Sequence, residues 1–283
     1  MRGYILVFIG VAVFATSLPL SSVAVAGFDG VTAGLGRALG GAICSGLTLL
    51  ALRPALPKGR QWRHLAYCGV GTGFIFPTFT ALGMTDVGAN DGAVVIAILP
   101  LSTAIFARFV EPDRKLSPWF WTGSILACVL VAAFILRDGF GGFSWGYIYL
   151  LFSLLVGFSY AWSARVAREV PAWQVICWGS LMALPIQVLI FAFIWPWLDL
   201  EAGWQAWLGL GLGVIGPQWA GFFAFYAGLA LVGGARGSLV QYSQPFLTFA
   251  FVAAIGMGTL DPQVLIYILA VLAALSLTRI GAK

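Results

Sequence analysis

The sequence predicts an all-α integral membrane protein in which ten transmembrane helices form two inverted five-helix repeats around a central cavity. Three observations indicate this arrangement. Hydrophobic residues make up 61% of the chain and charged residues only 9%, whereas a soluble domain carries roughly 25% charged residues because water must wet its surface. The apolar residues occur in long runs, and a pattern of glycine and proline recurs between the two halves of the chain.

The apolar runs have the length that a bilayer requires. A membrane-spanning helix needs about 20 mostly apolar residues, and the connections between the runs are too short to form a soluble domain. We expect transmembrane helices at residues 4–25, 30–52, 64–83, 91–110, 117–137, 145–167, 173–197, 205–230, 235–257 and 262–280.

The first run has a second interpretation. Arg2, the apolar stretch after it and residues 24–26 (AVA) resemble a secretory signal peptide with its small-residue cleavage site. However, the run is longer than the usual apolar region of such a peptide, and residues 3–5 (GYI) recur as residues 146–148 at the head of the sixth run. Cleavage would remove one member of a matched pair, so we expect a retained helix.

The positive charges predict the orientation. With the N-terminus in the cytoplasm, ten helices place every lysine and arginine except Arg37 and Arg137 on the cytoplasmic side, as the positive-inside rule requires. We therefore expect both termini in the cytoplasm and the chain in the inner membrane. The net charge of +5 then reflects topology, and no basic stripe indicates a nucleic-acid partner. We expect Arg37, near the outer end of the second helix, to snorkel toward the membrane surface.

Residues 211–216 (GLGVIG) match the G-x-G-x-x-G spacing of a dinucleotide-binding loop. That loop also needs a preceding strand and an acidic residue about 20 positions later. Here apolar residues continue on both sides, and no acidic residue follows Glu201 until Asp261, so we exclude this site and predict no cofactor. The stretch instead repeats an earlier one at an offset of 140: Gly71, Gly73, Ile75 and Pro77 recur as Gly211, Gly213, Ile215 and Pro217.

A second pair of segments repeats at an offset of 145. Residues 87–106 align with residues 232–251, and the identical positions include Val95/Val240, Pro100/Pro245, Thr103/Thr248 and Phe106/Phe251. Five helices separate the members of each pair, and an odd shift reverses the direction of crossing. The halves, residues 1–141 and 142–283, are therefore expected to be inverted repeats. Such repeats with glycine- and proline-interrupted helices are typical of secondary transporters.

This repeat resembles the drug/metabolite transporter superfamily, of the EamA type. In that family a small-residue loop leads into a helix with a central proline and an acidic exit. Residues 81–82, Pro100 and Glu111 follow this pattern, and so do Ala227 and Pro245, although the second half lacks the glutamate. Residues 160–162 (YAW) fit as well, and the chain is most similar to the YddG-like exporters of aromatic amino acids. The resemblance implies two EamA-like repeats, a central cavity and export of small metabolites without ATP by alternating access.

The interrupted helices predict where the cavity lies. A proline leaves the carbonyl four residues earlier without its helical partner, and exposed backbone at membrane depth is tolerated only against protein or a water-filled cavity. Here the freed carbonyls belong to Gly73, Ile96, Gly213 and Gln241. Polar and aromatic side chains gather at the same positions. We predict substrate-binding or cavity residues Thr78, Phe79, Tyr160, Trp162, Gln218, Trp219, Gln241, Tyr242 and Gln244, with helix-kink and gating residues Pro77, Pro100, Pro217 and Pro245.

The sequence predicts no catalytic activity. An enzyme would need a nucleophile and a base, or a set of metal ligands, within reach. The one histidine, His64, is expected in a basic loop, and the four cysteines are interpreted as small buried hydrophobes. We therefore predict no catalytic residue and no metal site. For the polar residues of the predicted cavity, hydrogen bonding between helices stays open as an alternative.

The predicted partners are a small-molecule substrate and the lipid bilayer, with the chain as a monomer. No aspartate or glutamate falls near the middle of a predicted helix. Proton relays and cation pumps usually rely on an intramembrane carboxylate, so a neutral or zwitterionic solute, such as an apolar or aromatic amino acid, is the favoured substrate. The alternatives are a sugar phosphate, a nucleobase-type compound or a cationic drug, and a membrane scaffold without transport activity.

Overall fold

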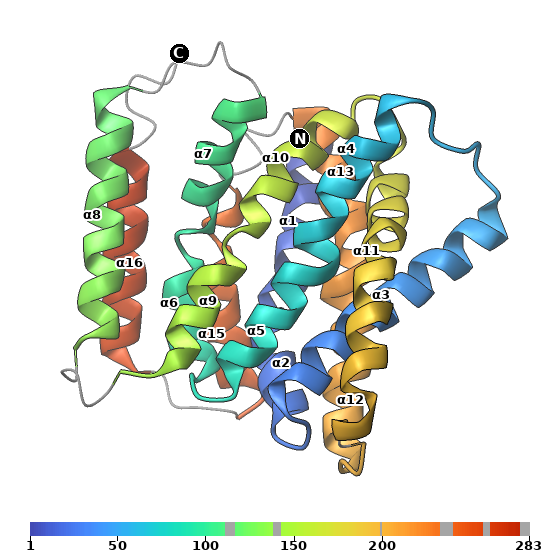
Figure 1. The fold of residues 1–283 in the computed structure, drawn as a ribbon. Coiled ribbons are helices and arrows are strands. Elements are labelled where there is room, and N and C mark those ends of the chain that lie inside the picture. The colour runs from blue at the N-terminus through green and yellow to red at the C-terminus, as the bar shows by residue number, and fades with distance from the viewer. Residues whose placement is uncertain (111–116, 138–142, 199, 233–239, 257–260, 278–283) are drawn as a thin grey trace.

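The protein is a bundle of helices (Figure 1). The computed structural model describes residues 1–110, 117–137, 143–198, 200–232, 240–256 and 261–277, and this part of the chain contains no β-strand. Within it, eight helical segments are long and apolar enough to cross a bilayer. The protein is therefore a multi-pass membrane protein, as the composition predicts.

The eight spans coincide with the first eight predicted runs, and several are built from two or three consecutive helices. They are Arg2–Val25 (α1, Arg2–Ala15; α2, Ser17–Val25), Gly30–Leu52 (α3), Arg60–Met84 (α4, Arg60–Gly69; the π-helix η1, Val70–Ile75; α5, Phe76–Met84), Ala89–Val110 (α6, Ala89–Ile96; α7, Leu99–Val110), Pro118–Ile135 (α8), Trp145–Val166 (α9, Trp145–Ser153; α10, Val156–Val166), Ala172–Trp197 (α11, Ala172–Ile194; the 3-10 helix η3, Trp195–Trp197) and Trp204–Val232 (α12, Trp204–Gly213; the π-helix η4, Val214–Ala220; α13, Gly221–Val232).

Two shorter apolar helices occupy the ninth and tenth predicted runs. They are α15, Gln244–Ala254, and α16, Pro262–Leu277. Because the described parts of these runs are shorter than a full span, the count of ten remains a prediction. Some sequence expectations lie outside the described residues: Glu111, the boundary between residues 141 and 142, and the positive charges after residue 277.

Polar caps set where individual helices begin. The carboxylate of Asp29 accepts hydrogen bonds from the backbone N–H groups of Val31 and Thr32 at 2.8 and 2.9 Å, which satisfies two free donors at the start of α3. Ser117 accepts from the N–H of Phe120 at 3.2 Å at the start of α8. These short caps let the chain turn at the membrane surface without a long loop.

The outer surface of the bundle is apolar, as contact with lipid requires. Leu50 on α3 and Phe193 on α11 are 72% and 74% exposed, although both are large hydrophobic residues. Helices that are hydrophobic on all sides are typical of membrane spans.

The four cysteines differ in their exposure. Cys68 and Cys177 are buried as predicted, but Cys44 is only half-buried and Cys128 is exposed. The expectation that all four are buried was wrong, because a cysteine is also tolerated on a lipid-facing surface.

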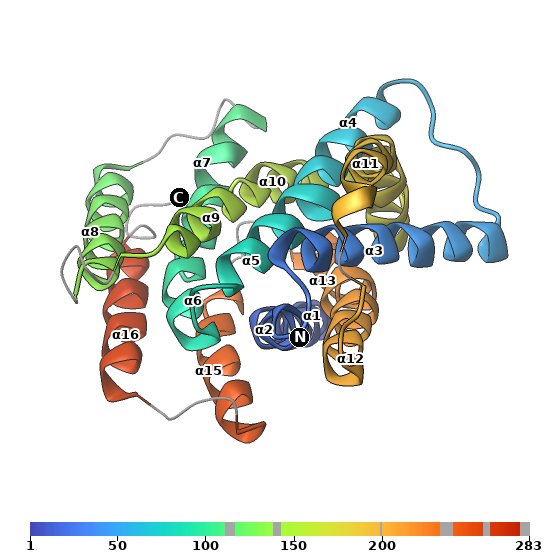
Figure 2. The ribbon, with the colours of Figure 1, turned by 60° about the horizontal axis from the view of Figure 1, so that its bottom comes forward.

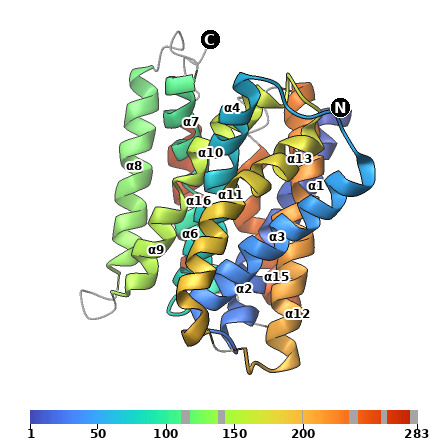
Figure 3. The same ribbon diagram turned by 45° about the vertical axis from the view of Figure 1, so that its right-hand side comes forward.

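The spans pack in a definite pattern. α1 and α2 lie along α13 and α12, while α4 and α5 lie along α10 and α9. α3 packs on α11 and is strongly inclined to the other helices, as Figures 1 and 3 show. α8 and α16 form a pair at one edge of the bundle, which is plain in the view of Figure 2. The span Arg2–Val25 is thus packed into the bundle.

Glycines allow the closest approach between spans. A Cβ atom on Gly228 would lie 2.7 Å from the carbonyl oxygen of Gly3, where α13 meets α1. A Cβ atom on Gly146 would lie 2.8 Å from the carbonyl oxygen of Gly83, where α9 meets α5. Neither position has room for any side chain, so backbone contacts backbone at both places.

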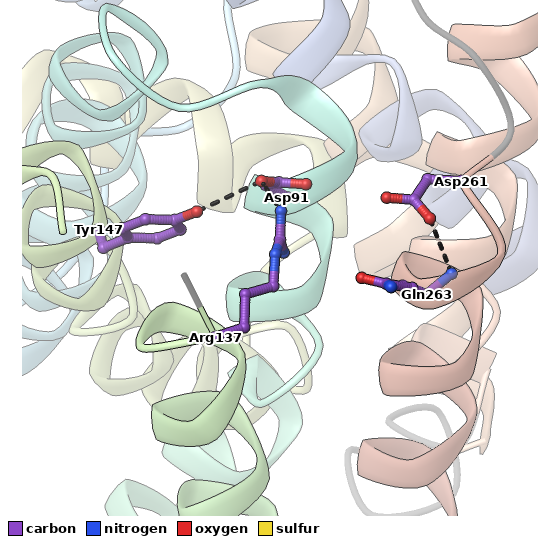
Figure 4. A network of polar contacts seen from close by, with 5 residues as sticks. All are labelled: Asp91, Arg137, Tyr147, Asp261 and Gln263. Atoms are coloured by element: carbon purple, nitrogen blue, oxygen red, sulfur yellow. Dashed lines mark hydrogen bonds and ion pairs between the residues drawn. The ribbon is translucent and has the colours of Figure 1, made fainter. Parts of the chain in front are cut away.

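An ion pair and a hydrogen bond join three helix ends (Figure 4). Nη2 of Arg137, beyond α8, lies 2.9 Å from a carboxylate oxygen of Asp91 in the first turn of α6. The hydroxyl of Tyr147 on α9 donates to the same oxygen at 3.3 Å. The guanidinium also lies 4.0 Å from the ring centre of Phe134. One of the two arginines that the sequence places on the outer side is therefore neutralised by a carboxylate.

The glycine contacts generate a stability prediction. Gly146→Ala and Gly228→Ala each force overpacking at a backbone contact, which costs about 1–3 kcal/mol. Both variants should lower the unfolding temperature of the purified protein in detergent. Gly46→Ala is the matched control on α3, because its Cβ would have only one neighbour, at an ordinary contact distance of 3.7 Å. Equal unfolding temperatures for all three variants would contradict the close packing.

Candidate functional site

The α-helical backbone is interrupted beside each of the four prolines in the predicted site. The π-helix η1 ends two residues before Pro77, and the π-helix η4 contains Pro217. Residues 97–98 separate α6 from α7 just before Pro100, and residues 242–243 precede α15 and Pro245. The last two interruptions are related by the same offset of 145 as the repeated sequence. The irregular backbone beside these four prolines thus lies in the third, fourth, eighth and ninth runs.

The carbonyl that Pro77 leaves free accepts a hydrogen bond from another span. Nε2 of Gln187, in the middle of α11, donates to the Gly73 carbonyl at 2.9 Å. Gln187 is 0% exposed, and its Oε1 has no hydrogen-bond partner in the described residues. Gln187 was not predicted from the sequence. The available signal was an amide within the apolar second half of the helix, two positions after Pro185.

The same arrangement occurs at Pro19. This proline removes the N–H that would bond the carbonyl of Ala15, where α1 ends. The hydroxyl of Thr248 on α15 donates to that carbonyl at 2.9 Å, and Thr248 is buried. A side chain from a distant part of the sequence again satisfies the backbone group that a proline has freed.

Gln218 joins the two π-helices. Its Nε2 donates to the Thr72 carbonyl in η1 at 2.8 Å, and the side chain is 1% exposed. The approach depends on Gly41 of α3, because a Cβ there would lie 2.5 Å from Cγ of Gln218. This geometry favours the alternative that the sequence left open for the polar residues, a hydrogen bond between helices.

Ser159 of α10 holds the start of η1. Its Oγ accepts from the N–H of Gly71 at 2.9 Å and donates to the carbonyl of Tyr67 at 2.6 Å. The π-helix therefore receives side-chain hydrogen bonds from three other spans, through Ser159, Gln187 and Gln218. Such a segment is stable at membrane depth because its irregular backbone groups have partners.

The two aromatic candidates on α10 have different surroundings. The ring of Tyr160 lies 5.8 Å from that of Phe225, and the side chain is 4% exposed. The ring of Trp162 lies 4.6 Å from His64 and 5.2 Å from Tyr67, between α10 and α4. Residues two apart on a helix point to different sides, so one candidate faces α13 and the other faces α4.

His64 departs from the expectation. The sequence predicts a basic loop at this residue, but His64 lies in α4 and is 8% exposed. It is covered by the ring of Trp162. The helix begins at Arg60, four residues before the predicted boundary, because the polar residues 60–64 form its first turn and the start of its second.

The repeat partners Phe79 and Trp219 also differ in their contacts. Phe79 stacks on Phe152 of α9 with ring centres 5.6 Å apart, and Phe152 is 51% exposed. Trp219 packs on Phe223 at 5.0 Å, and its buried indole nitrogen has no hydrogen-bond partner in the described residues. The hydroxyl of Thr78 is buried and likewise has no partner. Trp219 and Thr78 thus have unused polar atoms in the interior.

The residues around the break before α15 are buried or half-buried. Gln241 and Gln244 are 5% and 8% exposed, and Oε1 of Gln241 has no hydrogen-bond partner in the described residues. Tyr242 is half-buried. α15 packs against α1 and α6, so these residues lie inside the bundle.

The burial of Arg37 contradicts the prediction from the sequence. Instead of snorkelling to the surface, its side chain is 3% exposed. Nη1 donates to the Ser21 hydroxyl at 3.1 Å, the guanidinium lies 5.9 Å from the ring centre of Phe76, and Nε has no hydrogen-bond partner among the described residues. In the described part of the chain it forms no ion pair. The small residues around it in sequence, from Gly34 to Gly41, let α3 pack closely and enclose it.

Gln187 provides a test of the proline-linked hydrogen bonds. Gln187→Leu leaves the carbonyl of Gly73 buried without a partner, which costs about 1–3 kcal/mol. The unfolding temperature in detergent should fall. Gln263→Leu is the control, because Gln263 is exposed at the start of α16 and the structure gives its side chain no hydrogen bond. The hydrogen bond contributes nothing if the two variants unfold at the same temperature.

Comparisons with known proteins agree with this fold. The EamA-like transporter family model matches residues 1–136. The chain is 35% identical over 246 residues to "Uncharacterized transporter YdeK" of Bacillus subtilis (strain 168), covering 87% of this chain and 85% of that protein. A crystal structure with 17% identity superimposes with a TM-score of 0.66 over 98% of this chain and 97% of the other, which shows a common fold. The chain therefore belongs to the EamA-like transporter family, within the drug/metabolite transporter superfamily.

Proposed function

We propose that the protein is a secondary carrier that exports amino acids with apolar or aromatic side chains. It works without ATP, by alternating access between two inverted five-helix repeats, residues 1–141 and 142–283. It lies in the inner membrane with both termini in the cytoplasm. One observation carries the proposal: irregular backbone beside a proline occurs in two pairs of runs, and each pair is related by the sequence repeat. Membership of a transporter family supports a small-molecule substrate.

The glycine contacts support the inverted repeat. Gly3 of the first span meets Gly228 of the eighth, and Gly146 of the sixth meets Gly83 of the third. Gly3 and Gly146 open the matched GYI segments. In an inverted repeat, a contact between spans one and eight has its counterpart between spans six and three. The two close contacts have this relationship.

Hydrogen bonds between the proposed halves stabilise one conformation of the carrier. Gln187 and Gln218 belong to the second half, while their acceptors Gly73 and Thr72 belong to the first. When one half rocks against the other, these hydrogen bonds have to break or find new partners, because each bond joins one half to the other. Single π-helical turns inside α-helices occur frequently at functional sites, which supports the π-helices as the places where the halves rock.

The interior chemistry favours an uncharged or zwitterionic solute with an aromatic or apolar side chain. The acidic residues in the described part of the chain lie at helix ends or between helices, for example Asp29, Asp91 and Glu169. The described residues offer a cation no carboxylate in the middle of a span. Trp219, Tyr160 and Tyr242 offer rings with polar atoms, which suit an aromatic side chain attached to a polar group.

Resistance to toxic amino-acid analogues tests the proposed export. Cells that overproduce the protein should tolerate aromatic analogues better than cells carrying the empty vector, because export lowers the internal concentration. Loaded vesicles should also release labelled L-phenylalanine faster when they contain the protein. No change across several analogues, with the protein shown to be in the membrane, would refute amino-acid export.

Variants at Trp219 and Gln241 separate the binding site from the packing. Trp219→Ala and Gln241→Ala should lower transport about fivefold, which corresponds to about 1 kcal/mol for one lost polar contact. Their unfolding temperatures should stay close to that of the parent protein. Gln218→Ala should instead lower the unfolding temperature, since it removes the bond to Thr72. A loss of stability without a loss of activity per folded molecule would assign Trp219 and Gln241 to packing.

A further inference from the structure

Arg37 is a buried cation without a counter-ion among the described residues. A charged side chain inside a membrane span is costly and is usually paired or functional. Arg137, the other arginine on the predicted outer side, satisfies this rule by pairing with Asp91 at 2.9 Å. For Arg37 the described residues supply one hydrogen bond, to the neutral hydroxyl of Ser21. A buried guanidinium with this environment requires an anion from elsewhere.

A small pocket lies beside the guanidinium of Arg37. Its volume is about 10 Å³, room for about one water molecule. The walls are mainly small side chains together with two leucines: Ala24, Ala33, Ala81, Gly209, Gly213, Leu20 and Leu210, with Ser21 and Arg37 supplying the polar atoms. Apart from Ser21 and Arg37, the walls offer no side chain that could bind an ion. The pocket therefore combines one cation with an apolar shell.

We propose that Arg37 binds the carboxylate of the transported substrate. A guanidinium presents N–H donors in a planar fork that matches the two oxygens of a carboxylate. Nε belongs to that fork and has no hydrogen-bond partner in the part of the chain that the structure describes, while Ser21 accepts a hydrogen bond from Nη1 and fixes the orientation of the group. A phosphate would bring a second negative charge that a single arginine leaves uncompensated. A carboxylate brings one charge and neutralises the site.

The position of the pocket connects binding with the conformational change. Its walls come from α2, α3 and α5 of the first proposed half and from α12 of the second. Rocking of the two halves would widen or close it. The inference rests on the proposed function, because it assigns the carboxylate end of the proposed amino-acid substrate.

Three related probes separate the carboxylate from the rest of the substrate. L-phenylalanine carries both a carboxylate and an ammonium group, 3-phenylpropionate lacks the ammonium, and phenethylamine lacks the carboxylate. The first two should raise the unfolding temperature of the full-length protein in detergent, and phenethylamine should not. In Arg37→Gln, the concentration of 3-phenylpropionate needed for half-maximal stabilisation should rise about tenfold or more, as expected for a lost charge-assisted hydrogen bond.

Two further variants keep the test valid if Arg37→Gln does not fold. Arg37→Lys retains the charge without the fork and should weaken 3-phenylpropionate binding less than loss of the charge. Gly213→Ala places a methyl group 3.9 Å from Cδ of Arg37, without a clash, and should weaken carboxylate binding by narrowing the pocket. Gly211→Ala, on the same helix, has no neighbour within 4 Å of its Cβ and is the matched control.

The proposal is overturned by any of three results. Phenethylamine could stabilise the protein as well as 3-phenylpropionate does, or Gly213→Ala and Gly211→Ala could bind 3-phenylpropionate alike. Chloride, inorganic phosphate or added phosphatidylglycerol could also displace 3-phenylpropionate at equal or lower concentration. The last result would assign Arg37 to an inorganic anion or a lipid headgroup.

Vesicle transport distinguishes this proposal from the proposed function. If the protein binds carboxylates through Arg37 but vesicles release no amino acid, the export function fails and the assignment of Arg37 stands. If vesicles release L-phenylalanine and the Arg37→Gln protein releases it at the parent rate, export stands and the assignment of Arg37 fails.

Discussion

The whole structure depends on one requirement: the bilayer core holds no water, so every backbone N–H and C=O group there needs a hydrogen-bond partner within the protein. Each proline inside a span creates such a group, and the molecule satisfies two of them with side chains from distant segments. Gln187 bonds the carbonyl that Pro77 frees, and Thr248 bonds the one that Pro19 frees. A local defect in one helix is thereby converted into a specific contact with another. These hydrogen bonds fix how the helices are positioned against one another. Apolar packing alone cannot do so, because lipid tails are as apolar as the side chains.

Electrostatics imposes the second constraint. Two arginines lie on the predicted outer side, and the structure treats them differently. Arg137 lies at a helix end, half-exposed, beside a carboxylate and an aromatic ring. Arg37 is enclosed by small residues of α3 and its neighbours, with a serine hydroxyl and a more distant phenylalanine ring. The difference follows from the small residues on α3, because close packing hides a side chain that would otherwise reach the membrane surface.

The sequence predicted the spans, but not the contacts that their side chains make. Run lengths and composition located eight spans because the bilayer sets both quantities, and Pro77 and Pro100 located interruptions because the missing N–H is local. The contacts of Gln187 and Gln218 depend on which helices become neighbours, and no local pattern contains that information. Arg37 was misjudged for the same reason. Snorkelling is the usual outcome for an isolated arginine, but helix packing decides whether the path to the surface is open.

The contacts that stabilise this conformation are also those that a carrier has to exchange. Backbone meets backbone at Gly3 and Gly228 and at Gly83 and Gly146, which fixes α1 to α13 and α9 to α5 as stiff units. The bonds to the π-helix η1, by contrast, each consist of one side chain and one carbonyl. Both kinds of contact join the first proposed half to the second, so rocking of the halves has to keep or exchange all of them. Stability and movement thus depend on the same contacts within the bundle.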